Sequence, residues 1–199
     1  MKNKIRIFQI LFLGLFLLSS CTPIAFLMYG VKNPKPVSHK YISKAIDKYQ
    51  LSHFTNFTFD SKSDFISFFK QLKEFGLETS VNQVLIFNSQ GFYYLPIDTS
   101  YCSGKVLDFV NHYKENSILV DTVSFNPLFM NSFRSIEDKK KYHFLKDSKK
   151  DLLVLTWASY AGRLNKINTK KWADSISKQV QENKIDAIFL NLDLQKDWE

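Results

Sequence analysis

Two nearly continuous apolar runs, residues 152–157 and 187–192, constrain the fold of this chain more than any other feature of its sequence. Runs of this length are typical of strands that are covered on both faces, as in a parallel sheet. Between the two runs, apolar residues recur at the spacing of an amphipathic helix: Trp172, Ala173, Ile176 and Val180. The pattern predicts a βαβ unit with a right-handed crossover, and therefore an α/β fold.

The chain before this unit also alternates between helices and strands. Amphipathic periodicity predicts helices that start after Ser38, over 63–75 and over 104–115, with Ser38 and Ser63 as N-caps. Short apolar runs predict strands over 56–59, 84–87 and 92–95. Residues 88–91, Asn-Ser-Gln-Gly, have the length and composition of a β-hairpin turn. Residues 121–150 are a connector, in which a short helix over 136–145 is expected.

The N-terminus has the organisation of a targeting signal. Lys2, Lys4 and Arg6 precede an apolar stretch over 7–18, and Leu-Ser-Ser-Cys follows at 18–21. This motif resembles the lipobox of bacterial lipoproteins. The resemblance implies a signal peptide over 1–20, lipidation of Cys21, a tether over 21–36, and an α/β domain over 37–199 that is held outside the cytoplasm at the bacterial cell envelope.

An uncleaved membrane anchor is the alternative to a cleaved signal. Residues 7–29 contain no charged side chain, and 23 residues are enough to span a bilayer as a helix. Pro23 would interrupt such a helix, and the small residues before Cys21 are suited to cleavage, so the lipoprotein interpretation is preferred. Either interpretation places the protein at a membrane.

A second motif follows the first apolar run, at the point where a helix is expected to begin. Residues 157–166 read Trp-Ala-Ser-Tyr-Ala-Gly-Arg-Leu-Asn-Lys. They resemble the active-site segment of the thioredoxin family, which reads Trp-Ala-x-Trp-Cys-Gly-x-Cys-x-Lys. Six residues form the degenerate active-site segment: Trp157, Tyr160, Ala161, Gly162, Arg163 and Leu164. Because Ala161 and Leu164 replace both cysteines, the resemblance implies a thioredoxin-like domain without dithiol redox chemistry.

Residues 58–91 and the helix after 104 resemble the other half of a thioredoxin fold, in reversed order along the chain. In that family a cis-proline precedes the first hairpin strand, and here Asn82 occupies its position, where a cis bond is not expected. The order permits a permuted single domain, two degenerate units, or an incomplete domain. One compact mixed sheet flanked by helices is favoured, because a lone βαβ unit of about 50 residues buries too little surface.

Cys102 is the remaining candidate for chemistry. If Cys21 is lipidated, Cys102 has no partner cysteine within the chain. It precedes a predicted helix, whose N-terminus would favour the thiolate. A thiol-dependent redox protein that acts through Cys102 alone is therefore the alternative to a redox-inactive binding module.

Composition argues against several other classes of function. Six glycines and no glycine-rich loop leave no nucleotide-binding signature, and four scattered histidines lack metal-ligand spacing, so no cofactor or metal is expected. After the signal, 24 basic side chains face 19 acidic ones. Six lysines at 139–150 are interpreted as a solvated loop rather than a nucleic-acid site. The expected partners are the membrane, through the lipid, and an envelope protein or peptide.

Overall fold

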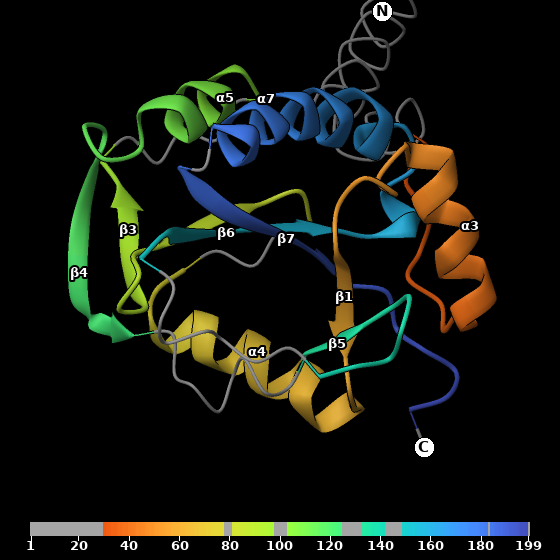
Figure 1. The fold of residues 1–199 in the computed structure, drawn as a ribbon. Coiled ribbons are helices and arrows are strands. Elements are labelled where there is room, and N and C mark those ends of the chain that lie inside the picture. Colours follow the sequence, from red (N-terminus) through yellow and green to blue (C-terminus); the bar gives the residue numbers. More distant parts are fainter. Residues whose placement is uncertain are drawn as a thin grey trace, which may run out of the picture.

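The computed structural model describes residues 30–77, 81–97, 103–124, 133–141, 149–182 and 184–198. Within them, seven strands form one sheet in the order β4-β3-β2-β6-β7-β1-β5 (Figure 1). The strands are β1 (Asn56–Phe59), β2 (Val84–Phe87), β3 (Phe92–Pro96), β4 (Ser117–Ser124), β5 (Phe133–Ser135), β6 (Asp151–Trp157) and β7 (Ile185–Asn191). The helices are α3 (His39–Tyr49), α4 (Lys62–Glu74), α5 (Ser103–His112) and α7 (Lys170–Gln181). None of the helices in these ranges is long and apolar enough to cross a bilayer.

The sheet combines a parallel unit with an antiparallel hairpin. β6 and β7 pair in parallel across the α7 crossover, and β2 pairs antiparallel with β6 on the other side. The hairpin β2–β3 therefore belongs to the same sheet as the βαβ unit, as predicted. β1 extends the sheet in parallel beyond β7, and the edge strands β4 and β5 are antiparallel to their neighbours. The mixed sheet flanked by helices confirms the predicted α/β class.

Each face of the sheet has its own apolar core. α3, α5 and α7 cover one face, and α4 covers the other (Figure 1). On β6, Leu153, Leu155 and Trp157 pack under the first group of helices, whereas Leu152 and Val154 face the α4 side. Because successive side chains of a strand point to opposite faces, an unbroken apolar run fills both cores.

Several local predictions are confirmed, with one correction at a helix end. The 88–91 turn forms, and the Asn88 side chain accepts hydrogen bonds from the backbone N–H groups of Gln90 and Phe92. Ser38 is the N-cap of α3, although its side chain makes no capping bond. The cap of α4 is Ser61 rather than Ser63, because the Ser61 hydroxyl accepts from the Asp64 N–H at 3.1 Å.

The connector was the least accurate prediction. No helix forms over 136–141, the described part of the helix expected over 136–145. The Ile136 N–H instead donates to the Asn56 carbonyl at 2.9 Å, and Lys141 forms a bridge with Arg134, so the chain turns back at the sheet edge. Strand β4 was not predicted, since polar residues interrupt its apolar run.

Candidate functional site

The degenerate active-site segment lies at the carboxyl end of β6. Trp157 is fully buried and its ring packs edge-on against Tyr49, with 6.4 Å between centroids. The chain then forms a single 3-10 turn, η1 (Ser159–Ala161), in which Ala161 is buried and Tyr160 half-buried. At Gly162 the backbone adopts φ 59° and ψ −124°, a conformation that favours glycine. Arg163 is exposed and Leu164 is half-buried.

A buried carboxylate joins this turn to the end of the neighbouring strand. Asp193 follows β7 and is 1% exposed. Its two oxygens accept hydrogen bonds from the backbone N–H and the hydroxyl of Ser159, both at 2.8 Å. The side-chain amide of Asn191 donates to the same carboxylate at 2.8 Å. The carboxylate therefore fixes the start of η1 against the end of β7.

A pocket of about 540 Å³ opens beside this carboxylate. It lies at the carboxyl ends of the parallel strands β6 and β7, the position where open α/β sheets commonly bind ligands. Two tyrosines and a valine supply apolar surface, two lysines supply positive charge, and the polar groups of Asn33, Ser159 and Asp193 complete the lining. The lining residues are Lys32, Asn33, Lys35, Val37, Tyr41, Ser159, Tyr160 and Asp193.

The end of the predicted tether forms one wall of this pocket. The Lys32 N–H donates to the Tyr160 carbonyl at 2.8 Å. Further along, the Val37 N–H donates to the Leu194 carbonyl at 2.8 Å, and the Lys196 N–H donates to the Val37 carbonyl at 3.0 Å. Residues 32–37 therefore pack along the domain rather than extending away from it.

Asn82 lies next to the segment that leads into α7. It precedes β2, its N–H donates to the Thr156 carbonyl at 3.0 Å, and its side-chain oxygen accepts from the Thr169 hydroxyl at 3.2 Å. Thr169 closes a π-helical turn, η2 (Asn165–Thr169), and such turns are frequent at functional sites. All peptide bonds of the described residues are trans, which agrees with the expectation at Asn82.

The pocket offers a ligand the neutral hydroxyl of Tyr160 and the positive charges of Lys32 and Lys35. Burial raises the pKa of the Tyr160 phenol above its ordinary value, and the Asp193 charge raises it further. The phenol is therefore protonated at neutral pH and can donate a hydrogen bond. No histidine is among the described residues that line the pocket, and the Ser159 hydroxyl donates to Asp193 instead. The described residues contain no group of three or more potential metal ligands.

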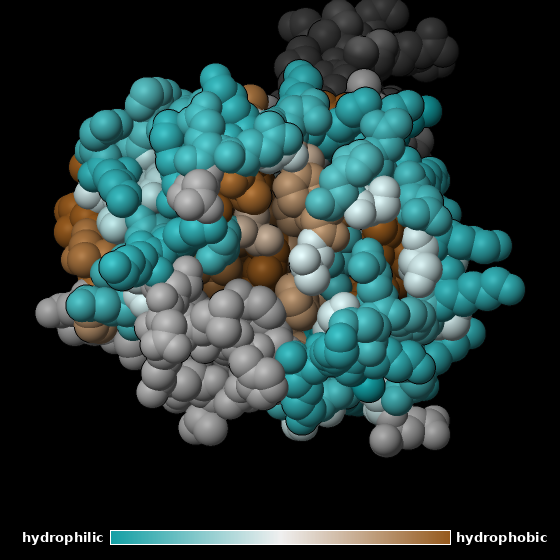
Figure 2. All heavy atoms as spheres, viewed as in Figure 1, coloured by the Kyte–Doolittle hydropathy of each residue, from teal (hydrophilic) through white to brown (hydrophobic). Residues whose placement is uncertain are grey.

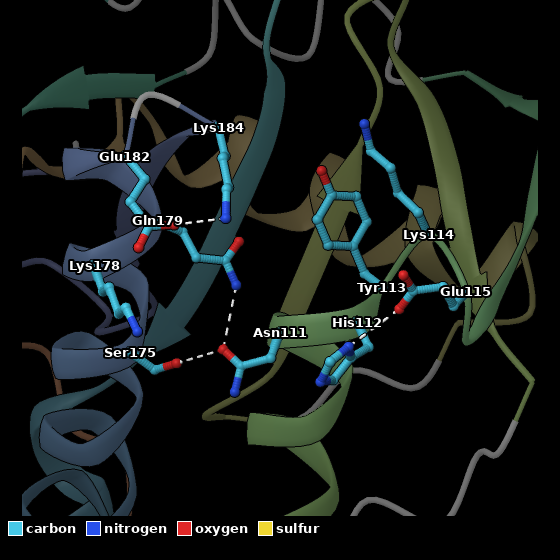
Figure 3. A pocket seen from close by; sticks show the side chains of 10 residues that line it. All are labelled: Asn111, His112, Tyr113, Lys114, Glu115, Ser175, Lys178, Gln179, Glu182 and Lys184. Carbon is cyan, nitrogen blue, oxygen red and sulfur yellow. Dashed lines mark hydrogen bonds and ion pairs between the residues drawn. The ribbon is translucent and has the colours of Figure 1, made fainter.

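A second hollow of about 620 Å³ lies at the opposite end of β6 and β7, between α5 and α7 (Figure 3). The Asn111 side chain accepts hydrogen bonds from Ser175 at 2.9 Å and from Gln179 at 3.3 Å. On its rim, Lys184 forms an ion pair with Glu182, and the His112 ring nitrogen Nδ1 lies within hydrogen-bond distance of Glu115, at 3.1 Å. The Asn111 hydrogen bonds connect the two helices, and the hollow is therefore interpreted as part of their packing.

The structure places only some of the predicted site residues. Cys21 and Cys102 lie outside the described residues, so the lipidation and thiol hypotheses stay predictions. The sequence analysis missed Asp193 and Lys32 as site residues. The signal for Asp193 was present, because polar residues follow two buried strands whose carboxyl ends must meet in a parallel pair. Lys32 had no such signal, since its place in the pocket depends on how the N-terminal segment folds back.

Three comparisons with known proteins complete the description of the site. No protein-family model, no curated protein and no solved structure gave a significant match to this chain.

Proposed function

We propose that this protein is a lipid-anchored bacterial envelope protein whose thioredoxin-like domain has lost redox chemistry and serves as a binding module. Cys21 carries the lipid, and the domain lies outside the cytoplasm. The ligand is a segment of an envelope protein or peptide that docks in the pocket at the carboxyl ends of β6 and β7. No reaction is assigned to the domain, because neither Ala161 nor Leu164 carries a thiol.

The arrangement of the strands supports the proposed thioredoxin-like ancestry. A βαβ unit and a β-hairpin followed by a helix are the two halves to which the sequence is similar, and here they share one sheet. The crossover helix α7 and the helix after the hairpin, α5, lie on the same face (Figure 1). Asn82, at the position of the family's cis-proline, contacts the η2 segment. These features favour the permuted single domain over the two alternatives.

The pocket that Ser159 and Tyr160 line is the observation that carries the proposed binding role. Tyr41 and Tyr160 supply broad apolar surface with a polar tip, a combination that is common in protein interfaces. Lys32 and Lys35 add positive charge at the rim. An extended segment with an apolar side chain and a nearby carboxylate would complement this lining, so a peptide of that chemistry is the expected ligand.

Photo-crosslinking in cells tests the binding role. A photoreactive phenylalanine analogue at position 41 should form an adduct with one or a few envelope proteins. The same analogue at position 118, which is also exposed but lies on the edge strand β4, serves as the matched control and should form no such adduct. Identical adducts at both positions, or none at position 41, would contradict a binding site at this pocket.

Metabolic labelling with a clickable fatty acid tests the anchor. The full chain should be labelled, and Cys21→Ser should abolish both the label and the shortening of the chain. Cys102→Ser is the matched control and should leave both unchanged. A Cys21→Ser chain that is still labelled and processed would show that the lipobox interpretation is wrong.

A further inference from the structure

The positive charge of this chain is concentrated in two segments. Residues 30–50 and 159–171 together contain nine basic side chains and one acidic side chain, Asp47. The rest of the chain after Cys21 contains 15 basic and 18 acidic side chains. The excess of positive charge that remains after the signal therefore belongs entirely to these two segments.

The fold brings the two segments together at one end of the molecule. The Lys32 N–H donates to the Tyr160 carbonyl, and α3 packs against η2. Both segments lie at the carboxyl ends of β6 and β7, beside α3 in Figure 1, and Figure 2 shows hydrophilic residues over that side. The exposed basic residues of this basic face are Lys32, Lys35, Lys40, Lys44, Lys48, Arg163, Lys166, Lys170 and Lys171.

Two large apolar side chains are exposed within the same basic face. Tyr41 on α3 is 47% exposed, and Ile167 on η2 is 44% exposed. Lys40 and Lys44 flank the first on its helix, and Lys166 precedes the second. Apolar or amphipathic side chains surrounded by lysine are the composition of surfaces that lie in the headgroup region of a bilayer.

We propose that the basic face rests on the surface of an anionic lipid bilayer. This inference rests on the proposed membrane anchoring, because the anchor ends on the same face. Lys32 lies eleven positions after Cys21, and an extended chain over that distance reaches at most about 40 Å. The anchor therefore keeps the basic face close to the membrane, where the lysines attract anionic headgroups and Ile167 enters the interface.

The docked orientation has a consequence for the proposed binding pocket. Lys32, Lys35 and Tyr41 belong both to the pocket lining and to the basic face. A domain that rests on the bilayer presents this pocket at the membrane surface. The segment it binds is therefore expected to lie next to the membrane, in a protein that is itself anchored there.

The test uses the full acylated chain in vesicles of phosphatidylcholine alone or mixed with phosphatidylglycerol. In a Cys102→Ser background, a fluorophore is attached at Ile167→Cys or, as the matched control, at Ile118→Cys on the far edge strand, where the side chain is 59% exposed. Lipids that carry a quencher should quench the probe at position 167 severalfold more strongly than the probe at position 118. The quenching should require phosphatidylglycerol and weaken at high salt.

Charge reversal tests whether the basic face causes the quenching. Lys166→Glu with Lys170→Glu should abolish the quenching at position 167, whereas Lys70→Glu with Lys73→Glu on α4 changes the net charge equally and should not. Equal quenching at positions 118 and 167, or equal effects of the two double variants, would overturn the inference. Loss of the quenching at position 167 when mixed-sequence DNA is added would also overturn it, because the face would then bind polyanions in general.

Flotation of the same samples separates this inference from the proposed anchoring. A chain that floats with both kinds of vesicle but shows no quenching at position 167 retains its anchor and lacks the docked face. A chain that floats with neither kind of vesicle overturns the anchoring, and with it the docked orientation.

Discussion

At the end of β7, the Asp193 carboxylate accepts three hydrogen bonds, two from Ser159 and one from Asn191, while only 1% of the residue is exposed. Removing a buried acceptor leaves its donors without partners, and the resulting cost exceeds the net contribution of the bonds themselves. The residue therefore acts first as a structural connection between two strand ends, and its role in the pocket depends on that connection.

Replacing this carboxylate tests how much its hydrogen bonds contribute to the free energy of unfolding. Asp193→Asn places an amide N–H₂ against groups that already donate, so we expect a loss of about 2 kcal/mol in the free energy of unfolding. Asp197→Asn, which changes an exposed residue four positions later, should alter that free energy by less than about 0.5 kcal/mol. Urea titrations of both variants measure the difference. Equal effects would show that the Asp193 hydrogen bonds contribute little to stability.

A second buried carboxylate, Asp151, makes the free energy of unfolding depend on pH in the alkaline range. The Tyr113 hydroxyl donates to it at 2.7 Å. Burial raises the pKa of Tyr113 well above its ordinary value, and the hydrogen bond and charge of Asp151 raise it further. Because the folded-state pKa is raised, this contribution to stability is fully present below about pH 10, the ordinary tyrosine pKa, and declines as the pH rises above it.

Tyr113→Phe tests this linkage. It should lower the free energy of unfolding by about 1–3 kcal/mol at neutral pH, because a hydrogen bond to a buried carboxylate is lost. Above about pH 10 the variant should lose less stability than the parent chain, since one tyrosine no longer resists ionisation. Tyr41→Phe, at an exposed position, is the control and should keep the parent's pH profile. Unfolding curves measured across this pH range would contradict the linkage if all three profiles were parallel.

At the scale of elements, the segment between β6 and α7 departs from a regular helix. A 3-10 turn, a positive φ at Gly162 and a π-helical turn follow one another before α7 begins. The sequence analysis expected a helix to begin at this segment, whereas here Gly162 separates Ala161 from the helical residues. The local geometry therefore decides whether two thiols at these positions would meet.

Restoring the cysteine pair tests that geometry. In a Cys21→Ser, Cys102→Ser background, Ala161→Cys with Leu164→Cys should form an intramolecular disulfide under mild oxidation, provided that the Cα atoms lie within about 7 Å. The parent chain should show no insulin reductase activity, because that reaction needs two thiols within reach. Ala161→Cys alone is the control and should remain a free thiol. If both new thiols stay free in a folded chain, the proposed relationship to the thioredoxin active site is wrong.

At the scale of the whole molecule, the hairpin and the βαβ unit share one sheet and two cores. β2 contributes Val84 and Ile86 to one core and Leu85 and Phe87 to the other. β6 contributes to the same two cores and pairs directly with β2. Neither half covers its apolar surface without the other, so the two are expected to unfold as one cooperative unit.

Unfolding by two probes tests this cooperativity. Trp157 and Trp172 belong to the βαβ half, and Trp198 packs against Phe59 and Phe65. Fluorescence therefore reports the packing around these three side chains, whereas far-ultraviolet circular dichroism reports all elements. The two transitions should coincide. Leu85→Ala, at a fully buried position of the hairpin, should lower both midpoints together and cost about 2–5 kcal/mol. Ile118→Ala, on an exposed edge, is the control and should cost much less. Two separate transitions would favour two independent units.

Helices and strands in which apolar residues recur at a regular spacing were predictable from the sequence. The strands β1, β2, β3, β6 and β7 and the helices α3, α4, α5 and α7 were predicted close to their observed positions, because burial on one or two faces imposes a period of two or 3.6 on apolar residues. The edge strands β4 and β5 lack that period, since an edge strand need not bury both faces. The pocket was predicted only in part: the sequence identified the Tyr160 segment but neither Asp193 nor Lys32 as part of a site.

The sequence by itself determined the α/β class, the hairpin, the βαβ unit and the absence of thiols at positions 161 and 164. These properties depend on residues that are close together in the chain. Only the tertiary structure decided that one sheet contains both halves, that Ser159 meets Asp193, and that residues 32–37 pack beside Tyr160. Each of these contacts joins segments that are distant in sequence, and no local pattern records which distant segment will supply the partner. The physical reason is that such contacts form when whole elements bury their shared apolar faces, a process that depends on the complete fold.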